Sequence, residues 1–495
     1  MVTEGESGFK RDERLSLKGN GIILAILAAM AMMVMFIEIM LVPALPHIAM
    51  EFREDAAWVS WVLSAYLLSG AVATLLLGRL GDIYGKKKVM MASLIIYCVG
   101  LIGCALSWSM GSLITFRAIQ GLGMGVFVLA FGIIRDTFPT RLIPVAIGMI
   151  SAMFSVGVSI GLLGGGFIVS QLSWRDAFYV VAPLMIVLTA MVWWRIKDVA
   201  RQQEKESVDF IGAMLVSGAV LSLLLALQQG QDWGWTDSRI ISLFATAAFL
   251  TMAFVFWETR KASMPLVSID LMRVRGIAGA NVAALFVGMS MFLLFQTLPF
   301  FLMSPKEIGG FGVQDAFMIG VYMFPSALAQ LIFAPLAGKW SRSIGADKML
   351  ISGLLILTLG MFLISFWHEA LWQVMVNVFI AGLGLGFAMV SLINVVAMSC
   401  PKRQFGVASG MNTLFRVVGG SIGPVLGSVI TASFMVNYFP PGSPFPIQLP
   451  GETGYTMVFM VAGLIAFIGA MICALMRPGK GACFEEESPA VGAEA

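Results

Sequence analysis

The sequence predicts an all-α integral membrane protein with 14 transmembrane helices. Of its 495 residues, 59% are hydrophobic and only 12% are charged, whereas soluble domains carry about 25% charged residues. The mean hydropathy is +0.91. Stretches of about 20 apolar residues, the length that a helix needs to cross hydrocarbon, recur along the whole chain. The basic residues gather in alternate breaks between these stretches, as they do in proteins that cross a membrane many times.

The expected spans are separated by breaks that carry Gly, Pro and clusters of charge, which is typical of loops. Each span is long enough to cross a bilayer as a helix. They cover about 21–46, 57–78, 88–107, 111–133, 144–170, 176–196, 209–229, 239–257, 277–303, 313–337, 348–367, 371–397, 405–434 and 454–476.

The distribution of basic residues predicts the orientation. Of the 31 Lys and Arg residues, two lie inside expected spans and four lie in breaks assigned to the outside, whereas the other 25 lie in inside segments. Because loops rich in Lys and Arg stay in the cytoplasm, we expect a multi-pass protein of the plasma (inner) membrane with both termini cytoplasmic. The six exceptions are Arg117 and Arg416 in spans, and Arg53, Arg175, Arg239 and Lys306 outside.

Three glycine patterns recur in order at offsets of 260 to 262 residues. One match alone is weak, since glycine-rich helices coincide by chance, but three at a nearly constant offset indicate an internal repeat. Parallel repeats of this kind place a central site at their interface. The matched pairs are Gly78–Gly85 with Gly338–Gly345, Gly121–Gly125 with Gly382–Gly386, and Gly161 with Gly423.

The repeat predicts three parts of the chain. Residues 1–205 form an N-terminal six-helix half with spans 1–6, and residues 263–495 form a C-terminal half with spans 9–14 and a polar tail. Residues 206–262 hold the two inserted spans, 7 and 8. Since the inserted spans carry no charge at mid-depth, we expect them to be peripheral helices that bridge the two halves.

Glu38 is the only carboxylate well inside an expected span. A charge at that depth costs about 2.5–3.5 kcal/mol on insertion scales. Such a residue is therefore paired, protonated or on a water-filled path, and it indicates a site that handles protons or cations. The alternative is a carboxyl group that is hydrogen-bonded between helices and has only a structural role.

Arg117 lies at a depth similar to that of Glu38. At 1.5 Å per residue, the two residues lie about 9 and 12 Å from the outer ends of their spans. We expect Glu38 to exchange Arg117 for a proton or a cationic substrate, with Gln120 one turn further in extending the polar path. The alternative is a permanent ion pair between spans 1 and 4.

The second half contains a possible second site at Arg416, Asn412 and Gln296. Arg416 needs an anionic or carbonyl partner, although no carboxylate lies deep in spans 9–14. For Asn412 and Gln296, a hydrogen bond to a neighbouring helix is the alternative explanation.

The sequence lacks the motifs that several classes of enzyme and binding protein require. It contains no phosphate-binding loop, no HExxH and no GxSxG, and its five cysteines and two histidines show no metal-ligand spacing. We therefore expect no enzyme activity, no cofactor, no metal site and no nucleic-acid partner. The expected partners are a small-molecule substrate, protons and membrane lipids, and the expected state is a monomer. A membrane receptor or channel stays open as an alternative.

The break after span 2 reads GRLGDIYGKKK. It resembles motif A of the major facilitator superfamily, GxLxDxxGxkxx. The resemblance implies a cytosolic gate in which Asp82 and the basic residues form a latch, with Gly78, Gly85, Lys86 and Lys87 as further members. In the second copy, Arg342 stands in the position of Asp82.

Other strings are similar to the fourteen-span drug:proton antiporter branch of that superfamily. In its first span an Asp usually occupies the position of Glu38. The resemblance implies proton-coupled efflux (antiport) of hydrophobic or cationic drug-like compounds by alternating access. Uptake or export of a metabolite or organic anion is the alternative. The strings are Phe36–Pro46, Trp58–Tyr66, Arg117–Gly121, Trp174–Phe178 and Asp209–Gly212.

Span 5 departs from the antiporter pattern GxxxGPxxGG. Its glycines Gly157, Gly161, Gly164 and Gly165 are present and allow helices to approach closely, but Leu162 replaces the proline. The second copy has that proline as Pro424, after Gly423. The kink of span 5 and the direction of exchange therefore stay open at the level of sequence.

Overall fold

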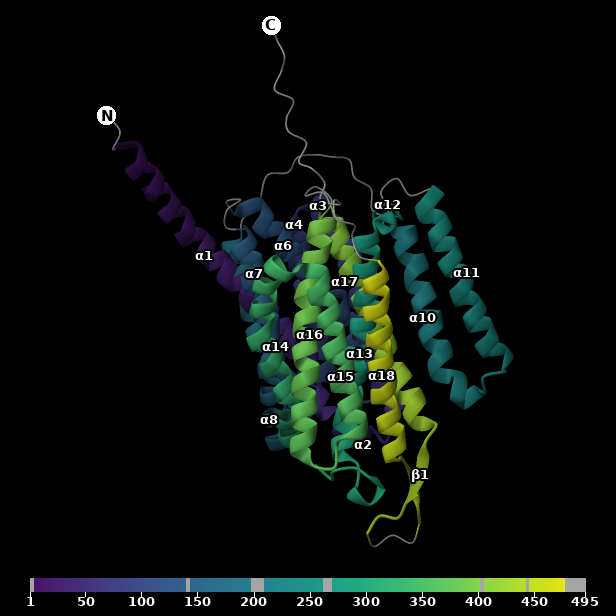
Figure 1. The fold of residues 1–495 in the computed structure, drawn as a ribbon. Coiled ribbons are helices and arrows are strands. Elements are labelled where there is room, and N and C mark those ends of the chain that lie inside the picture. The colour runs from purple at the N-terminus through teal and green to yellow at the C-terminus, as the bar shows by residue number, and fades with distance from the viewer. Residues whose placement is uncertain are drawn as a thin grey trace.

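The computed structural model describes residues 4–138, 143–196, 209–260, 269–400, 405–441 and 445–476. These residues form a helical bundle with one small β-hairpin (Figure 1). The helices are α1 (Glu4–Ile39), α2 (Leu45–Phe52), α3 (Ala56–Tyr84), α4 (Lys86–Ala105), α5 (Met110–Leu122), α6 (Val126–Thr137), α7 (Ile143–Ile160), α8 (Gly166–Gln171), α9 (Trp174–Arg195), α10 (Phe210–Trp233), α11 (Ser238–Arg260), α12 (Ile269–Arg273), α13 (Arg275–Met303), α14 (Ala316–Ile344), α15 (Ala346–Phe366), α16 (Leu371–Ser399), α17 (Phe405–Ala432) and α18 (Glu452–Leu475). Shorter elements are η1 (Val42–Ala44), the π-turn η2 (Gly161–Gly165), η3 (Lys306–Ile308), and the antiparallel strands β1 (Met435–Tyr438) and β2 (Ile447–Pro450).

The all-helical membrane fold is confirmed. Within the described residues, 11 helices are long and apolar enough to cross a membrane. Shorter apolar stretches lie in three more regions, Trp58–Gly70 in α3, Val156–Gln171 in α7 to α8, and Ile211–Leu227 in α10. The protein is therefore a multi-pass membrane protein.

The two ends of the bundle are easily told apart. The start of α1, the α3–α4 turn and the last turn of α18 lie at one end, here called the terminus end (Figure 1). The β1–β2 hairpin projects from the other end, here called the hairpin end. Helices α1–α9 are called the N-terminal group below, and α13–α18 the C-terminal group.

Local backbone features repeat between the two groups at the offset of 260 residues. The side chains of Asp55 and Asp315 each accept a hydrogen bond from a backbone N–H at the start of α3 and α14, so both residues are N-caps. Gly85 and Gly345 each join two helices through one residue, with φ of 98° and 103°. A side chain would strain that backbone, so both turns need glycine.

Glycines bring α7 and η2 close to α1. A Cβ atom added at Gly157, Gly161 or Gly165 would lie 3.0 Å or less from a carbonyl oxygen of α1 or of the residue that follows it. The oxygens belong to residues 32, 36 and 40, one helical turn apart. A side chain at these positions would force apart the helix pair that carries Glu38.

The C-terminal group contains a matching pair. Cβ atoms at Gly419 and Gly423 of α17 would lie 2.7 Å or less from the carbonyl oxygens of Leu285 and Met289 on α13. Gly161 and Gly423, which the sequence repeat matches, thus have the same role in the two groups. Pro424 follows Gly423 inside α17, which stays helical through it.

The helix of span 5 is irregular even though it lacks the proline. Residues Gly161–Gly165 form a π-turn, which has one extra residue per turn and bends a helix as a proline does. Leu162 is fully buried within this turn. The irregularity therefore lies where the antiporter pattern has its proline, but its cause here is the π-turn.

Helix α10 lies on the seam between the two groups. Its Leu224 is fully buried against Trp61 and Ala65 of α3 and Val425 of α17. Helix α11 packs on α10 and has mostly exposed side chains (Figure 1). The expected boundaries at 205–206 and 262–263 lie outside the described residues.

We expect Leu224→Ala to lower thermal stability without changing substrate selectivity. Deleting a buried Leu side chain costs about 2–5 kcal/mol in protein cores, and this side chain lies outside the charged centre of the bundle. The neighbouring Leu225, which is exposed, is the matched control. The measurements are the unfolding temperature in detergent and the transport ratio of two unlike substrates. A change in that ratio as large as in Glu38, Arg117 or Gln120 variants would contradict the expectation.

The two groups also meet directly at the hairpin end. The Nε2 of His47 donates a hydrogen bond to the carbonyl of Gln314, 2.8 Å away. Gly166 and Gly320 allow α8 and α14 to approach so closely that an added Cβ would lie under 3.0 Å from the carbonyls of Ala316 and Leu162, respectively. Close packing therefore closes the hairpin end between η2, α8 and α14.

Candidate functional site

Glu38 lies in the last turn of α1, just before the chain breaks into η1. Its side chain is 3% exposed, and its Oε2 has no hydrogen-bond partner among the described residues. The glycine contacts of α7 and η2 pack on both sides of this turn. Glu38 is therefore buried in the structure, and its role as a site for protons or cations stays a prediction.

Arg117 of α5 is fully buried. It forms no ion pair with Glu38 in the described structure, although such a pair was one of the two arrangements that the sequence allowed. Its Nε donates to the carbonyl of Val62, 3.0 Å away, and one terminal nitrogen donates to Oε1 of Gln120, 2.9 Å away. The guanidinium centre lies 4.3 Å from the centre of the Tyr66 ring, in cation–π contact. Arg117 acts on Glu38 through its charge, not through a hydrogen bond.

Two tyrosines complete this polar cluster, and the sequence reasoning did not assign them. Tyr66 of α3 and Tyr97 of α4 are fully buried, and neither hydroxyl has a hydrogen-bond partner in the described structure. Tyr66 is the last residue of the string Trp58–Tyr66. The resemblance of that string to the fourteen-span antiporter branch could have identified Tyr66 as a candidate site residue. Tyr97 is a single tyrosine in an apolar span, and nothing in the sequence distinguishes it from a packing residue.

Arg416 of α17 lies within electrostatic range of Glu38 on α1. The charges of Glu38 and Arg416 are close enough to interact. Helices α3 and α17 are held together by a hydrogen bond from Ser64 to the carbonyl of Ser421, 2.9 Å away. The charges of the two predicted sites are therefore near enough to influence each other across the two groups, although no ion pair joins Arg416 to Glu38 in the described structure.

Asn412 and Gln296 have different environments. The Nδ2 of Asn412 donates to the carbonyl of Ala280 at 2.9 Å and to Oδ1 of Asn281 at 3.2 Å, so Asn412 joins α17 to α13. Gln296 of α13 is 2% exposed, and neither atom of its amide has a partner among the described residues. Of the two, only Gln296 has fully buried amide atoms without a hydrogen-bond partner among the described residues.

The basic turn between α3 and α4 has a partner within the same group. The Nζ of Lys86 lies 2.5 Å from Oδ2 of Asp136 and 3.4 Å from the carbonyl of Gly132, both on α6. The sequence reasoning missed Asp136. Gly78 and Asp82 lie in the last turns of α3; the placement of the Asp82 side chain lies outside the described residues. Lys87 is partly buried beside Lys86.

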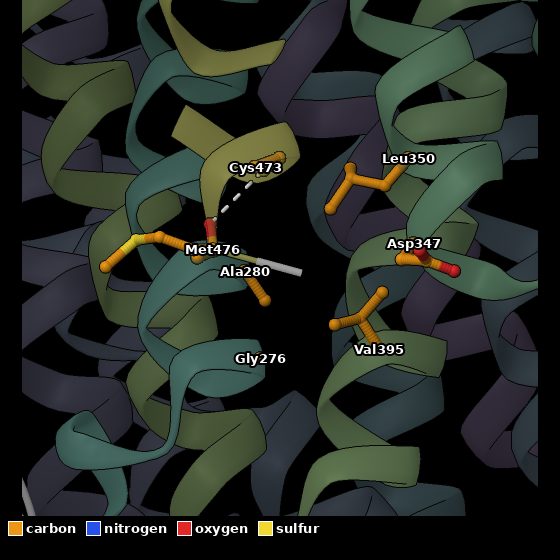
Figure 2. Close-up of a pocket in the computed structure, with 8 residues that line it drawn as sticks. Gly276, Ala280, Asp347, Leu350, Val395, Cys473 and Met476 are labelled. Atoms are coloured by element: carbon orange, nitrogen blue, oxygen red, sulfur yellow. Dashed lines mark hydrogen bonds between the residues drawn. The ribbon is translucent and has the colours of Figure 1, made fainter. Parts of the chain in front are cut away.

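A small cavity lies at the terminus end of the C-terminal group. Figure 2 shows Ala280, Cys473 and Met476 on one side of it, facing Leu350 and Val395 on the other. Its volume is about 10 Å³, which holds at most one water molecule. The Sγ of Cys473 donates to the carbonyl of Gly279 at 3.5 Å. None of the predicted site residues lines this cavity, so it is a gap in the packing.

A larger groove of about 620 Å³ lies at the hairpin end. It is lined by residues from η3, the end of α17, β1 and the start of α18, among them Glu307 and Glu452. Glu452 pairs with His368 at 3.0 Å. The groove is large enough for a small organic molecule, but it is separate from the charged centre at Glu38.

Comparison with known proteins agrees with this geometry. The family model of the Major Facilitator Superfamily matches residues 24–327 and 280–491. Multidrug resistance protein Stp of Mycobacterium tuberculosis (strain CDC 1551 / Oshkosh) is 29% identical over 82% of this chain and 75% of its own length. The tetracenomycin C resistance and export protein of Streptomyces glaucescens is 28% identical over 80% and 73%.

Two further comparisons extend the match. Multidrug transporter protein MdtP of Bacillus subtilis (strain 168) is 29% identical over 76% of this chain and 69% of its own length. The crystal structure of the POT family transporter PepTSo superposes with a TM-score of 0.66 at 16% identity, covering 93% of this chain and 97% of that one, which shows a shared fold. The chain therefore belongs to the Major Facilitator Superfamily and is a membrane transporter, not an enzyme.

Proposed function

We propose that this transporter exports hydrophobic or cationic drug-like compounds in exchange for protons. The observation that carries the proposal is Glu38, a buried carboxyl group with an oxygen that has no hydrogen-bond partner among the described residues. The relatives named for drug resistance and export support the substrate class.

The geometry supports a simple exchange at Glu38. Since none of the hydrogen bonds that Arg117 makes goes to Glu38, Glu38 stays available to a proton or to a cationic group. A carboxyl group in a dry site is stable when it is either neutral or paired with a cation. Binding of one partner therefore displaces the other, which is the requirement for antiport.

Charge across the seam couples this exchange to movement of the two groups. Glu38 lies on α1 and Arg416 on α17, so the attraction between them holds the N-terminal group to the C-terminal group. Protonation of Glu38 removes that attraction. The proposed cycle is alternating access, in which the two groups rock about the central site.

We also propose a topology of 14 spans in two six-helix halves with an inserted pair. The three shorter apolar stretches in α3, α7 to α8, and α10 complete 14 spans, and the matching N-caps, glycine turns and glycine contacts support two six-helix halves around the inserted α10–α11 pair. The excess of Lys and Arg in alternate breaks of the sequence supports cytoplasmic termini in the plasma (inner) membrane. The working state is a monomer in contact with lipid.

The turn between α3 and α4 is proposed as the cytosolic gate. Gly85 supplies the positive φ that the turn needs, and Lys86 reaches Asp136 of α6. These contacts support a latch formed by the basic residues with Asp82, Gly78 and Lys87 that holds the terminus end shut in one state of the cycle.

One observation favours a second candidate function, transport of an organic anion. The central cluster combines two arginines, Arg117 and Arg416, with a single carboxyl group, Glu38, so its net charge is positive when all three are ionised. A site with excess positive charge attracts anions. Under this alternative, Arg416 binds the substrate and Glu38 only sets the proton coupling.

The test is substrate-dependent proton movement in liposomes that contain the purified protein. With a pH gradient imposed, ethidium should drive protons in the direction opposite to its own movement. An aromatic organic anion should have no effect. Proton movement with the anion and none with the cation would favour the second candidate, and no movement with either would contradict both.

A further inference from the structure

Next to Glu38, the N-terminal group holds several polar atoms that no described protein atom satisfies. Each of five side chains contributes one such atom, and all five are at most 3% exposed. They come from α1, α3, α4 and α5. The atoms are Oε2 of Glu38, the hydroxyls of Tyr66 and Tyr97, one terminal nitrogen of Arg117 and the amide nitrogen of Gln120. We call these side chains the polar chamber.

The members of the polar chamber are neighbours. Arg117 binds Gln120 and lies over the ring of Tyr66. The hydroxyl of Tyr97 interacts with Tyr66 and Gln120, although none of these contacts meets hydrogen-bond geometry. The charge of Glu38 acts on both hydroxyls. The unsatisfied atoms therefore belong to one cluster of neighbouring side chains.

Such a cluster needs polar partners from outside the protein. Buried polar groups are nearly always hydrogen-bonded, and a group left without a partner is costly in an apolar interior. A buried water molecule makes two to four hydrogen bonds to such groups. Because the free groups include both donors and acceptors, water fits them better than any single ion.

We infer that ordered water fills the polar chamber and that the Tyr66 and Tyr97 hydroxyls, together with this water, relay the exchanged proton to Glu38. The inference rests on the proposed function, since it concerns the proton that Glu38 exchanges. A hydroxyl group both donates and accepts. Each tyrosine therefore receives a proton from water on one side and passes its own proton on. Both hydroxyls end unchanged, Glu38 gains one proton, and the hydronium at the aqueous end of the chain becomes water.

The two tyrosines differ in what else they do. The ring of Tyr66 also supports the guanidinium of Arg117, which has its hydrogen bonds to Val62 and Gln120. Within the described part of the chain, the ring of Tyr97 makes no such cation–π contact. Replacing either tyrosine by Phe keeps the ring and removes only the hydroxyl, so the relay is tested without loss of packing.

The experiment compares Tyr97→Phe and Tyr66→Phe with Tyr179→Phe, a control at an exposed position of α9. Ethidium transport driven by a pH gradient is measured in liposomes, and its pH profile is recorded. Ethidium counterflow, which moves no net proton, is measured in the same preparation. We expect Tyr97→Phe to slow proton-driven transport about tenfold or more, somewhat below the usual effect of a proton-transfer group, with a changed pH profile and wild-type counterflow.

Each other outcome overturns the inference. If both chamber variants match Tyr179→Phe in proton-driven transport, the hydroxyls do not relay protons. If counterflow falls as much as proton-driven transport, their role is structural. If wild-type protein moves no protons with ethidium, the proposed function itself fails; if it moves them and the variants are unaffected, only the relay fails.

Discussion

Glu38→Gln is expected to abolish transport driven by a pH gradient while the protein still folds and inserts. Glutamine has nearly the same shape, and it removes a group whose charge is costly in a membrane. Expression and thermal stability should therefore stay at or above the wild-type level. Transport should fall at least about a hundredfold, as expected when a proton-transfer group is lost. The other four side chains of the polar chamber include no carboxyl group that could take over the role of Glu38.

The control for this experiment is Glu307→Gln, which removes an exposed carboxylate at the hairpin end. Ethidium efflux and proton movement are followed together in liposomes. Normal gradient-driven efflux by Glu38→Gln would show that another group carries the proton. Ethidium counterflow that persists in the variant would locate the defect in proton coupling.

Gly320→Ala is expected to prevent the hairpin end from closing. An added Cβ would lie under 3.0 Å from the carbonyl of Leu162 across the seam, and backbone cannot yield as a flexible side chain does. Overpacking of this kind costs about 1–3 kcal/mol, which shifts a two-state equilibrium about 5- to 150-fold. The protein should therefore accumulate in a state that is open at the hairpin end, and transport should slow accordingly.

Spin labels at Met50 and Glu307, exposed positions of the N- and C-terminal groups, measure this opening by their distance distribution. Gly338→Ala is the matched control on the same helix, since its Cβ would meet its nearest atom only at 3.7 Å. A longer distance is expected in Gly320→Ala alone. Equal distributions in the two variants would show that the contact with Leu162 does not hold the hairpin end shut.

Much of the fold was predictable because membrane insertion acts on local sequence. A span is recognised by its own 20 or so residues and its orientation by the charges beside it. The repeat was predictable for a similar reason, since Gly85 and Gly345 both serve turns that only glycine adopts readily. The π-turn at Gly161–Gly165 was not predictable, because the sequence shows only that its proline is missing.

The candidate site was predictable where a charged residue lies in an otherwise apolar span. Glu38, Arg117 and Arg416 are charges in apolar spans, and their cost alone marks them. Tyr97 was missed because tyrosine is a common residue in membrane helices and does not by itself indicate a functional site. Asp136 was missed because a carboxylate beside basic residues is common in loops. Only the structure shows that it pairs with Lys86.

The sequence by itself predicted most of the segments that are long and apolar enough to cross a membrane, the charges inside them, and glycine turns that recur along the chain. Only the tertiary structure decided which of those charges meet. It placed Arg117 in hydrogen bonds with Gln120 and Val62, put the charge of Arg416 within electrostatic range of Glu38, and packed α10 against both α3 and α17. The reason is that insertion depends on the hydropathy of each segment alone, whereas charge pairing depends on how helices far apart in the chain are rotated and packed against one another.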